Sequence, residues 1–148
     1  MAKIFVVGGS GRVASELIKN LINDGNQVFA SSRHPEKIIK LDNVVPVKLD
    51  LHSDVSAWSE VFKGMDVIYF VAGSRGKDLL QTDAMGAVKT MQAAENVGVK
   101  RYIMLSSLYA LQPEKWSQAE VIKHNNTIGK VIMMCSGYNP IETALKDI

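Results

Sequence analysis

The amino-acid sequence predicts an α/β fold, a doubly wound parallel sheet with helices on both faces. Short apolar runs rich in β-branched residues alternate with patterns of helical period, as in a sheet whose strands are joined by helices. A glycine-rich turn follows the first of these runs, and the third run contains Pro46, which suits an edge strand. In the strand order 3-2-1-4-5 the third strand is an edge, so the three observations agree.

The individual elements follow from the same patterns. We expect strands at residues 3–7, 27–31, 44–49, 67–71 and 102–105. We expect helices at residues 12–24, from Pro35, at 54–62 and at 77–96. The first helix has one apolar face, made of Val13, Leu17, Ile18, Leu21 and Ile22. Three helices are followed by a glycine that ends them: Gly25, Gly64 and Gly98. Beyond Pro113 the pattern loosens, with a helix at 114–125, a strand-like run at 131–134 and a last helix at 141–148.

The glycine-rich turn has the layout of a site for a dinucleotide phosphate. Gly8 allows a tight turn off the strand, Gly11 lets backbone amides approach a pyrophosphate, and small Ala14 lets the helix pack closely. The pattern is G-x-x-G-x-x-A and not the stricter G-x-G-x-x-G. The alternative is a tight strand-to-helix turn that holds no ligand.

The ends of the other strands carry further candidates. Arg33 follows the second strand, where sites for NAD usually have an acidic residue. Its guanidinium could pair with a 2′-phosphate, with help from Arg12, which favours NADP over NAD as the cofactor. The alternative is that Arg33 is a solvated loop cation.

The remaining strand ends carry small or polar residues. Asp50 follows the third strand and could accept a hydrogen bond from an adenine amino group, or could cap the next helix. Ala72 and Gly73 follow the fourth strand, where the backbone could run beside a ribose and nicotinamide. Ser106 and Ser107 follow the fifth, where a hydroxyl could touch a substrate carbonyl or could serve the turn alone.

Composition narrows the class of protein. The 148 residues are expected to form one domain, with 47% hydrophobic and 22% charged residues as in ordinary globular proteins. A net charge of +2 with scattered lysines argues against a nucleic-acid partner. Cys135 is alone, and His34, His52 and His124 have no ligand spacing, so no metal site is expected. Neither a signal peptide nor a membrane span is recognised, which predicts a cytoplasmic protein without a membrane partner.

The motifs together resemble an atypical short-chain dehydrogenase/reductase, with an NAD(P)-binding Rossmann fold. They are most similar to the nitrogen-metabolite-repressor-like and epimerase-like groups over about residues 3–116. The stretches that carry the resemblance occur in the family's order: residues 6–13, 32–37, 49–51, 69–74, 86–94 and 98–107. The resemblance implies cofactor contacts at Gly8, Ser10, Gly11, Arg12 and Val13, and recognition of the adenosine end at Arg33 and Asp50. It also implies that Ala72 and Gly73 lie beside the cofactor, and that Ser106 or Ser107 is the family's strand-five serine.

The sequence departs from this family in its catalytic pair. Active members use a tyrosine with a lysine four residues later, but the four tyrosines here are followed at that spacing by Gly73, Ser106, Pro113 and Glu142. Tyr109 is the alternative proton donor, or packs its loop. The chain is also short for the family and diverges from about residue 114. It stops before the catalytic helix, or it has a shortened C-terminal half.

Two functions of different class therefore remain. The first is an NADP-dependent oxidoreductase or epimerase-like enzyme acting on a small molecule that the sequence does not identify. The second is a non-catalytic NADP-binding module that senses redox state. A degenerate relative without function is a third reading. Apolar surface left by a short sheet also predicts a homo-oligomer, with residues 131–134 or 77–96 in the interface.

Overall fold

The computed structural model describes residues 1–74 and 77–105, which form a five-stranded parallel sheet in the order β3-β2-β1-β4-β5. The strands are β1 (Lys3–Val7), β2 (Gln27–Ser32), β3 (Val44–Lys48), β4 (Val67–Phe70) and β5 (Arg101–Met104). The strand order reverses between β1 and β4, the position at which doubly wound sheets bind ligands. The predicted fold class and strand order are confirmed.

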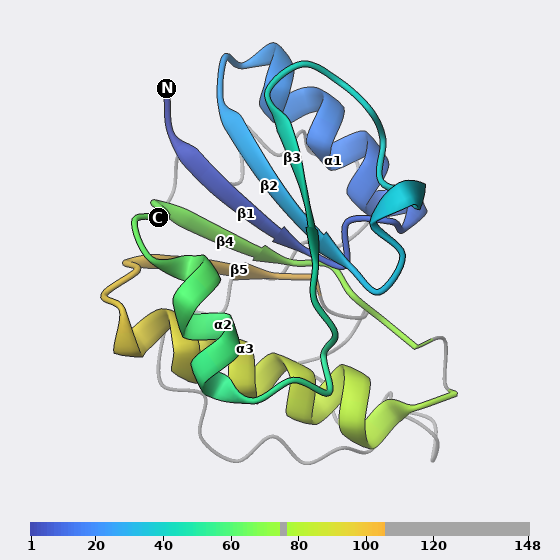
Figure 1. Ribbon diagram of the computed structural model, residues 1–148, viewed down its shortest axis with the longest axis vertical. Helices are drawn as coiled ribbons and strands as arrows, with labels where there is room; N and C mark the ends of the chain where they lie inside the picture. Colours follow the sequence, from blue (N-terminus) through green and yellow to red (C-terminus); the bar gives the residue numbers. More distant parts are fainter. Residues whose placement is uncertain (75–76, 106–148) are drawn as a thin grey trace, which may run out of the picture.

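Helices cover both faces of this sheet, as Figure 1 shows. Helix α1 (Arg12–Asn23) lies on one face, and α2 (Val55–Phe62) and α3 (Gly86–Asn96) lie together on the other. Two shorter elements complete the described chain: the 3₁₀ turn η1 (Pro35–Lys37) and the π-helical segment η2 (Leu79–Met85). No helix within the described residues is long and apolar enough to cross a membrane.

The alternation of side chains along β1 divides the core into two clusters. Ile4 and Val6 face α1, whereas Phe5 and Val7 face α2 and α3, and all four are almost completely buried. On the second face, Phe5 packs edge-on against Phe62 and Trp58, with ring centroids 5.0 and 6.3 Å apart. Because β1 is buried on both sides, its carboxyl end is held firmly beneath the glycine-rich turn.

Pro46 lies on the edge strand, as its missing amide requires. The backbone amide of Leu49 donates to Ser32 of β2, and successive residues alternate in direction along a strand. Residues 45 and 47 therefore face β2 with their amides, while Pro46 turns its ring nitrogen toward the open edge. The proline costs the sheet no hydrogen bond and leaves the outer edge a poor template for another strand.

The structure corrects two details of the predicted elements. The expected single helix over 77–96 is divided into η2 and α3 at Gly86, where a Cβ would lie 3.1 Å from a Leu51 methyl group. Val13, expected on the apolar face of the first helix, is 48% exposed, whereas its neighbour Ala14 is fully buried. The other boundaries agree with the prediction to within about one residue.

Candidate functional site

A cavity of about 490 Å³ lies at the carboxyl edge of the sheet, between the ends of β1, β2, β3 and β4. All nine residues that the sequence predicts as cofactor contacts line it: Gly8, Ser10, Gly11, Arg12, Val13, Arg33, Asp50, Ala72 and Gly73. A larger hollow of about 700 Å³ lies beside η1 and the outer edge of β3, and no predicted site residue lines it. The smaller cavity is therefore the candidate site.

The glycine-rich turn is shaped by close backbone approach at two positions. Gly8 has φ +87°, and a Cβ there would lie 2.6 Å from the Cα of Ala72. A Cβ on Gly9 would lie 2.7 Å from the Cβ of Ala30, and the Gly9 amide donates to the Ser31 carbonyl at 2.8 Å. Sequence reasoning assigned no role to Gly9, because its contact is with a strand about twenty residues away.

The first turn of α1 offers free backbone donors to this cavity. Gly11 is the N-cap and has no side chain to accept from the helix amides, and the first turn contains no acidic residue. Among the described residues, the amides of Arg12, Val13 and Ala14 make no hydrogen bond, whereas Ser15 donates to the Gly11 carbonyl at 3.0 Å. The positive end of the helix therefore faces the cavity with unused N–H groups.

A pair of serines joins the glycine-rich turn to the end of β2. The Ser32 hydroxyl donates to the Ser10 hydroxyl at 2.9 Å and accepts from the backbone amide of His34 at 3.0 Å. Arg33 lies between Ser32 and His34 in the sequence, and its side chain is exposed. Arg12, which follows the glycine-rich turn, is exposed as well. Within residues 1–74 and 77–105 neither guanidinium forms an ion pair, so both are available to an anion in the cavity. Ser32 is a lining residue that sequence reasoning did not single out.

An apolar wall closes the inner side of the cavity. Leu49, Leu51 and the fully buried Trp58 contribute to it. The Nε1 atom of Trp58 has no hydrogen-bond partner within the part of the chain that the structure describes. A flat, mostly apolar wall with a polar rim is typical of a pocket for an aromatic ring.

Asp50 lies on the rim of the cavity and does not cap α2. Its Oδ1 accepts from the backbone amide of His52 at 3.0 Å, and Asp54 is the cap, accepting from Ala57 at 2.9 Å. The sequence left both roles open for Asp50, and the structure excludes the cap. The alternation of strand and helix alone could not show which of the two aspartates, Asp50 or Asp54, caps the helix, because they are only four residues apart.

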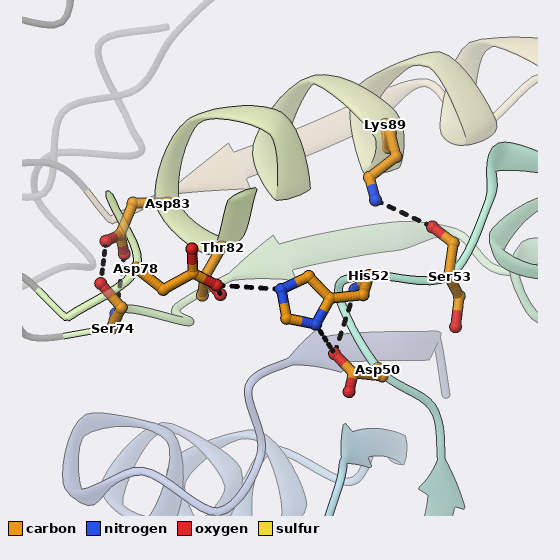
Figure 2. Close-up of polar contacts among 8 residues, drawn as sticks. All are labelled: Asp50, His52, Ser53, Ser74, Asp78, Thr82, Asp83 and Lys89. Carbon is orange, nitrogen blue, oxygen red and sulfur yellow. Dashed lines mark hydrogen bonds and ion pairs between the residues drawn. The ribbon is translucent and has the colours of Figure 1, made fainter. Parts of the chain in front are cut away.

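His52 lies between Asp50 and Asp78, as Figure 2 shows. Its Nε2 lies 2.9 Å from Asp78 Oδ2, an oxygen that also accepts from the Thr82 hydroxyl at 2.7 Å. Hydrogen bonds from Thr82 and then from His52 hold the pKa of Asp78 below its ordinary value. The sequence places these partners 26 residues apart, so no local spacing could have revealed them.

The end of β4 is held by a carboxylate as well. The Ser74 amide donates to Asp83 Oδ1 at 2.8 Å, and the Ser74 hydroxyl donates to Asp83 Oδ2. A Cβ on Gly73 would lie 3.4 Å from Asp83 Oδ1, so the carboxylate packs closely against the backbone that follows β4. Asp83 thus fixes the backbone that leads away from Ala72 and Gly73.

The chain matches a protein-family model described as NAD(P)H-binding, over residues 8–132. That match begins at the glycine of the tight turn and includes every predicted cofactor contact. The chain belongs to this NAD(P)H-binding family. The resemblance to NAD(P)-binding, epimerase-like Rossmann proteins is thereby confirmed.

Individual relatives agree with this assignment. The chain is 32% identical to an uncharacterized sugar epimerase, YhfK, of Bacillus subtilis, over 79% of this chain and 58% of that one. It is also 32% identical to the UPF0659 protein YMR090W of Saccharomyces cerevisiae, over 77% and 54%. The crystal structure of the oxidoreductase ylbE from Lactococcus lactis superposes with a TM-score of 0.74 at 45% identity, over 78% and 52%. The chain thus spans little more than half the length of these relatives.

The two described tyrosines, Tyr69 and Tyr102, do not line the cavity. Burial raises the pKa of the Tyr69 phenol, and it raises that of Tyr102 further. The Tyr102 hydroxyl is 2.8 Å from the Thr90 hydroxyl, on the face opposite α1. The predicted catalytic residues Ser106, Ser107 and Tyr109 lie outside the described residues, and so does every element expected beyond residue 105.

Two of the three histidines, His34 and His52, lie within the described residues. His34 and His52 are exposed and pair with carboxylates, and no group of three or more potential ligands occurs in residues 1–74 and 77–105. His34 follows β2 and His52 follows β3, so both lie in the connections that leave the carboxyl edge of the sheet.

Proposed function

We propose that this chain binds NADP(H) in the cavity at the carboxyl edge of its sheet, and that it provides the cofactor site of an oxidoreductase or epimerase-like enzyme. One observation carries the proposal: nine residues predicted separately, from four strand ends, line a single cavity. Family membership supports a nicotinamide dinucleotide as the ligand.

The shape of the glycine-rich turn supports a pyrophosphate above it. Gly8 and Gly9 bring the backbone so close to Ala72 and Ala30 that no side chain projects there. The unused amides at the start of α1 are donors for phosphate oxygens, and the absence of an acid from that first turn leaves the helix end positive. These features support the proposal that the turn holds a pyrophosphate.

The two free arginines support NADP over NAD. Arg33 follows β2, where an acidic residue would bind the hydroxyls of an NAD ribose, and Arg12 lies across the Ser10–Ser32 contact. Guanidinium groups pair with phosphate through two parallel hydrogen bonds, which suits a 2′-phosphate. Asp50 on the rim and the apolar wall beside it suit an adenine ring.

The far end of the cavity is suited to a nicotinamide. Ala72 and Gly73 leave backbone exposed at the end of β4, and Val13 lines the cavity across from them. When bound, the dinucleotide supplies hydride transfer, and the residues of this chain bind and orient it. Ser106, Ser107 and Tyr109 are proposed to meet the substrate.

A calorimetric titration with NADPH and with NADH tests the cofactor proposal. We expect micromolar or tighter binding of NADPH, and we expect Arg33→Ala to weaken it by about tenfold to a hundredfold, as for a charged hydrogen bond, with little effect on NADH. Lys40→Ala removes an exposed cation outside the cavity and serves as the matched control. Failure of both dinucleotides to bind would overturn the proposal.

A second function, a non-catalytic NADP sensor, is favoured by one specific observation. No tyrosine in the sequence has a lysine four residues later, and neither described tyrosine lines the cavity. Two assays separate the functions: NADPH oxidation with a panel of aldehydes and ketones, and product analysis of nucleotide sugars for epimerisation, which consumes no net NADPH. Turnover supports the enzyme, and tight binding without turnover supports the sensor.

A further inference from the structure

Thr82 lines the cavity from η2, and the sequence alone assigns it no role. Gly86 follows it by four residues, so the two share one face of the helical segment. At Gly86 the segment packs against Leu51, where an added Cβ would lie 3.1 Å from a Leu51 methyl group. Because Leu51 belongs to the apolar wall of the cavity, Thr82 lies next to that wall, on the side that carries Asp50.

Two hydrogen bonds to Asp78 fix the side chain of Thr82. Its backbone amide donates to the Asp78 carbonyl at 3.0 Å, and its hydroxyl donates to Asp78 Oδ2 at 2.7 Å (Figure 2). Asp78 can only accept, because the hydrogen bonds from Thr82 and then from His52 hold its pKa below the ordinary value and keep it ionised at neutral pH. The single proton of the Thr82 hydroxyl is thereby engaged, so its oxygen presents only lone pairs to the cavity.

Asp50 presents acceptors to the same part of the cavity. Its Oδ1 accepts from the His52 amide at 3.0 Å, and Oδ2 makes no hydrogen bond within residues 1–74 and 77–105. The His52 ring lies between Asp50 and Asp78, with its Nδ1 3.4 Å from Asp50 Oδ1 and its Nε2 2.9 Å from Asp78 Oδ2. Asp50 and Thr82 are therefore two acceptor groups that one connected set of contacts holds beside the apolar wall.

We propose that Thr82 is a specificity-determining residue, which together with Asp50 selects adenine over hypoxanthine at the adenosine end of a bound dinucleotide. The inference rests on the proposed function, because it concerns the ring that is bound in that same cavity. The adenine amino group has two N–H donors, one for each acceptor. In hypoxanthine a carbonyl oxygen replaces this amino group, so it would face the Thr82 oxygen with lone pairs on both atoms.

The test compares NADPH with reduced nicotinamide hypoxanthine dinucleotide phosphate, by calorimetric titration of the full chain at neutral pH. The two ligands differ only in the purine ring, so the ratio of their dissociation constants isolates its recognition. We expect the wild-type chain to prefer NADPH by about tenfold to a hundredfold, as when a polar group is left without its hydrogen bond. Thr82→Val has nearly the same shape but no hydroxyl, and it should reduce this preference by about threefold to tenfold. Thr82→Ser keeps the hydroxyl and should retain the preference.

Asp78→Ala tests whether the carboxylate determines the direction of the Thr82 hydroxyl. Without Asp78 the hydroxyl proton can turn toward the cavity and donate to the hypoxanthine carbonyl. The preference for NADPH should then fall by about threefold to tenfold, although Thr82 itself is unchanged. Loss of a negative charge acts alike on two ligands of equal charge, so it does not alter their ratio. Glu60→Ala is the matched control, because it removes an exposed carboxylate that pairs with Lys63 outside the cavity.

The outcomes distinguish this inference from the proposed function. If the wild-type chain binds both dinucleotides with equal affinity, the inference is refuted and the cofactor site stands. A preference that survives unchanged in Thr82→Val refutes the role of Thr82, and one that survives in Asp78→Ala refutes the part played by the engaged proton. Both substituted side chains are partly exposed, so we expect the variants to fold. If neither dinucleotide binds the wild-type chain, the proposed function and this inference fail together.

Discussion

Gly8 and Ala72 are so close that a Cβ on the glycine would lie 2.6 Å from the Ala72 Cα, well inside van der Waals contact. The two residues follow adjacent strands, β1 and β4, at the point where the strand order reverses. Their contact brings the glycine-rich turn and the end of β4 to opposite sides of one cavity. The geometry of the candidate site thus depends on a missing side chain.

Gly8→Ala should therefore destabilise the protein more than a positive φ alone explains. A non-glycine residue in the left-handed region costs about 1–3 kcal/mol, and the contact with Ala72 backbone atoms adds to this cost. Gly64→Ala is the control, because Gly64 has φ +73° but nothing lies within 4 Å of its added Cβ. Urea unfolding of both variants gives the difference, and equal free energies of unfolding would contradict the predicted clash.

The Ser10–Ser32 hydrogen bond should couple the glycine-rich turn to the loop that carries Arg33. Ser32→Ala also removes the acceptor for the His34 amide, so it should cost about 1–2 kcal/mol of stability, against about 1 kcal/mol for Ser10→Ala. A double-mutant cycle measured by chemical denaturation should give a coupling of about 0.5–1 kcal/mol. Strict additivity of the two substitutions would show that the hydroxyls do not interact.

Thr90 and Tyr102 should respond unequally to loss of their hydrogen bond. Tyr102→Phe leaves the Thr90 hydroxyl bonded to the carbonyls of Gly86 and Ala87, so the cost should be about 1 kcal/mol or less. Thr90→Val leaves the phenol of Tyr102 without this partner and should cost about 1–3 kcal/mol. Thermal unfolding of both variants tests whether Thr90→Val is the more destabilising substitution. The opposite order is expected if water replaces Thr90 as the hydrogen-bond partner of the phenol.

Asp54 should contribute to stability only above acidic pH. The hydrogen bond from the Ala57 amide, and then that from the Ser56 hydroxyl, lower its pKa from the ordinary value of 3.8. The contribution is present above that ordinary value and is lost as the pH falls through the lowered one. Asp54→Asn keeps an acceptor but not the charge, so its melting temperature should approach that of the wild-type protein as the pH falls through the lowered pKa of Asp54. A constant difference at all pH values would exclude the charge as the cause.

Most of the fold was predictable because its signals are local. A strand buried on both faces reads as a continuous apolar run, and the glycines that end helices are defined by a single backbone angle. Even Pro46 could be assigned to an edge, since a missing amide is a property of one residue. The division at Gly86 could not be predicted, because it depends on the approach of Leu51 from another part of the chain.

The candidate site was predictable residue by residue, but its connections were not. Arg33, Asp50 and Gly73 could be selected because parallel strands end at one edge, so residues that follow them meet there. Contacts between these strand ends, such as Ser32 with Ser10 and His52 with Asp78, join residues 22 and 26 positions apart. The sequence alone determined nine of the residues that line the cavity. Only the tertiary structure decided which of them touch, because hydrogen bonds act over about 3 Å in space and have no fixed separation along the chain.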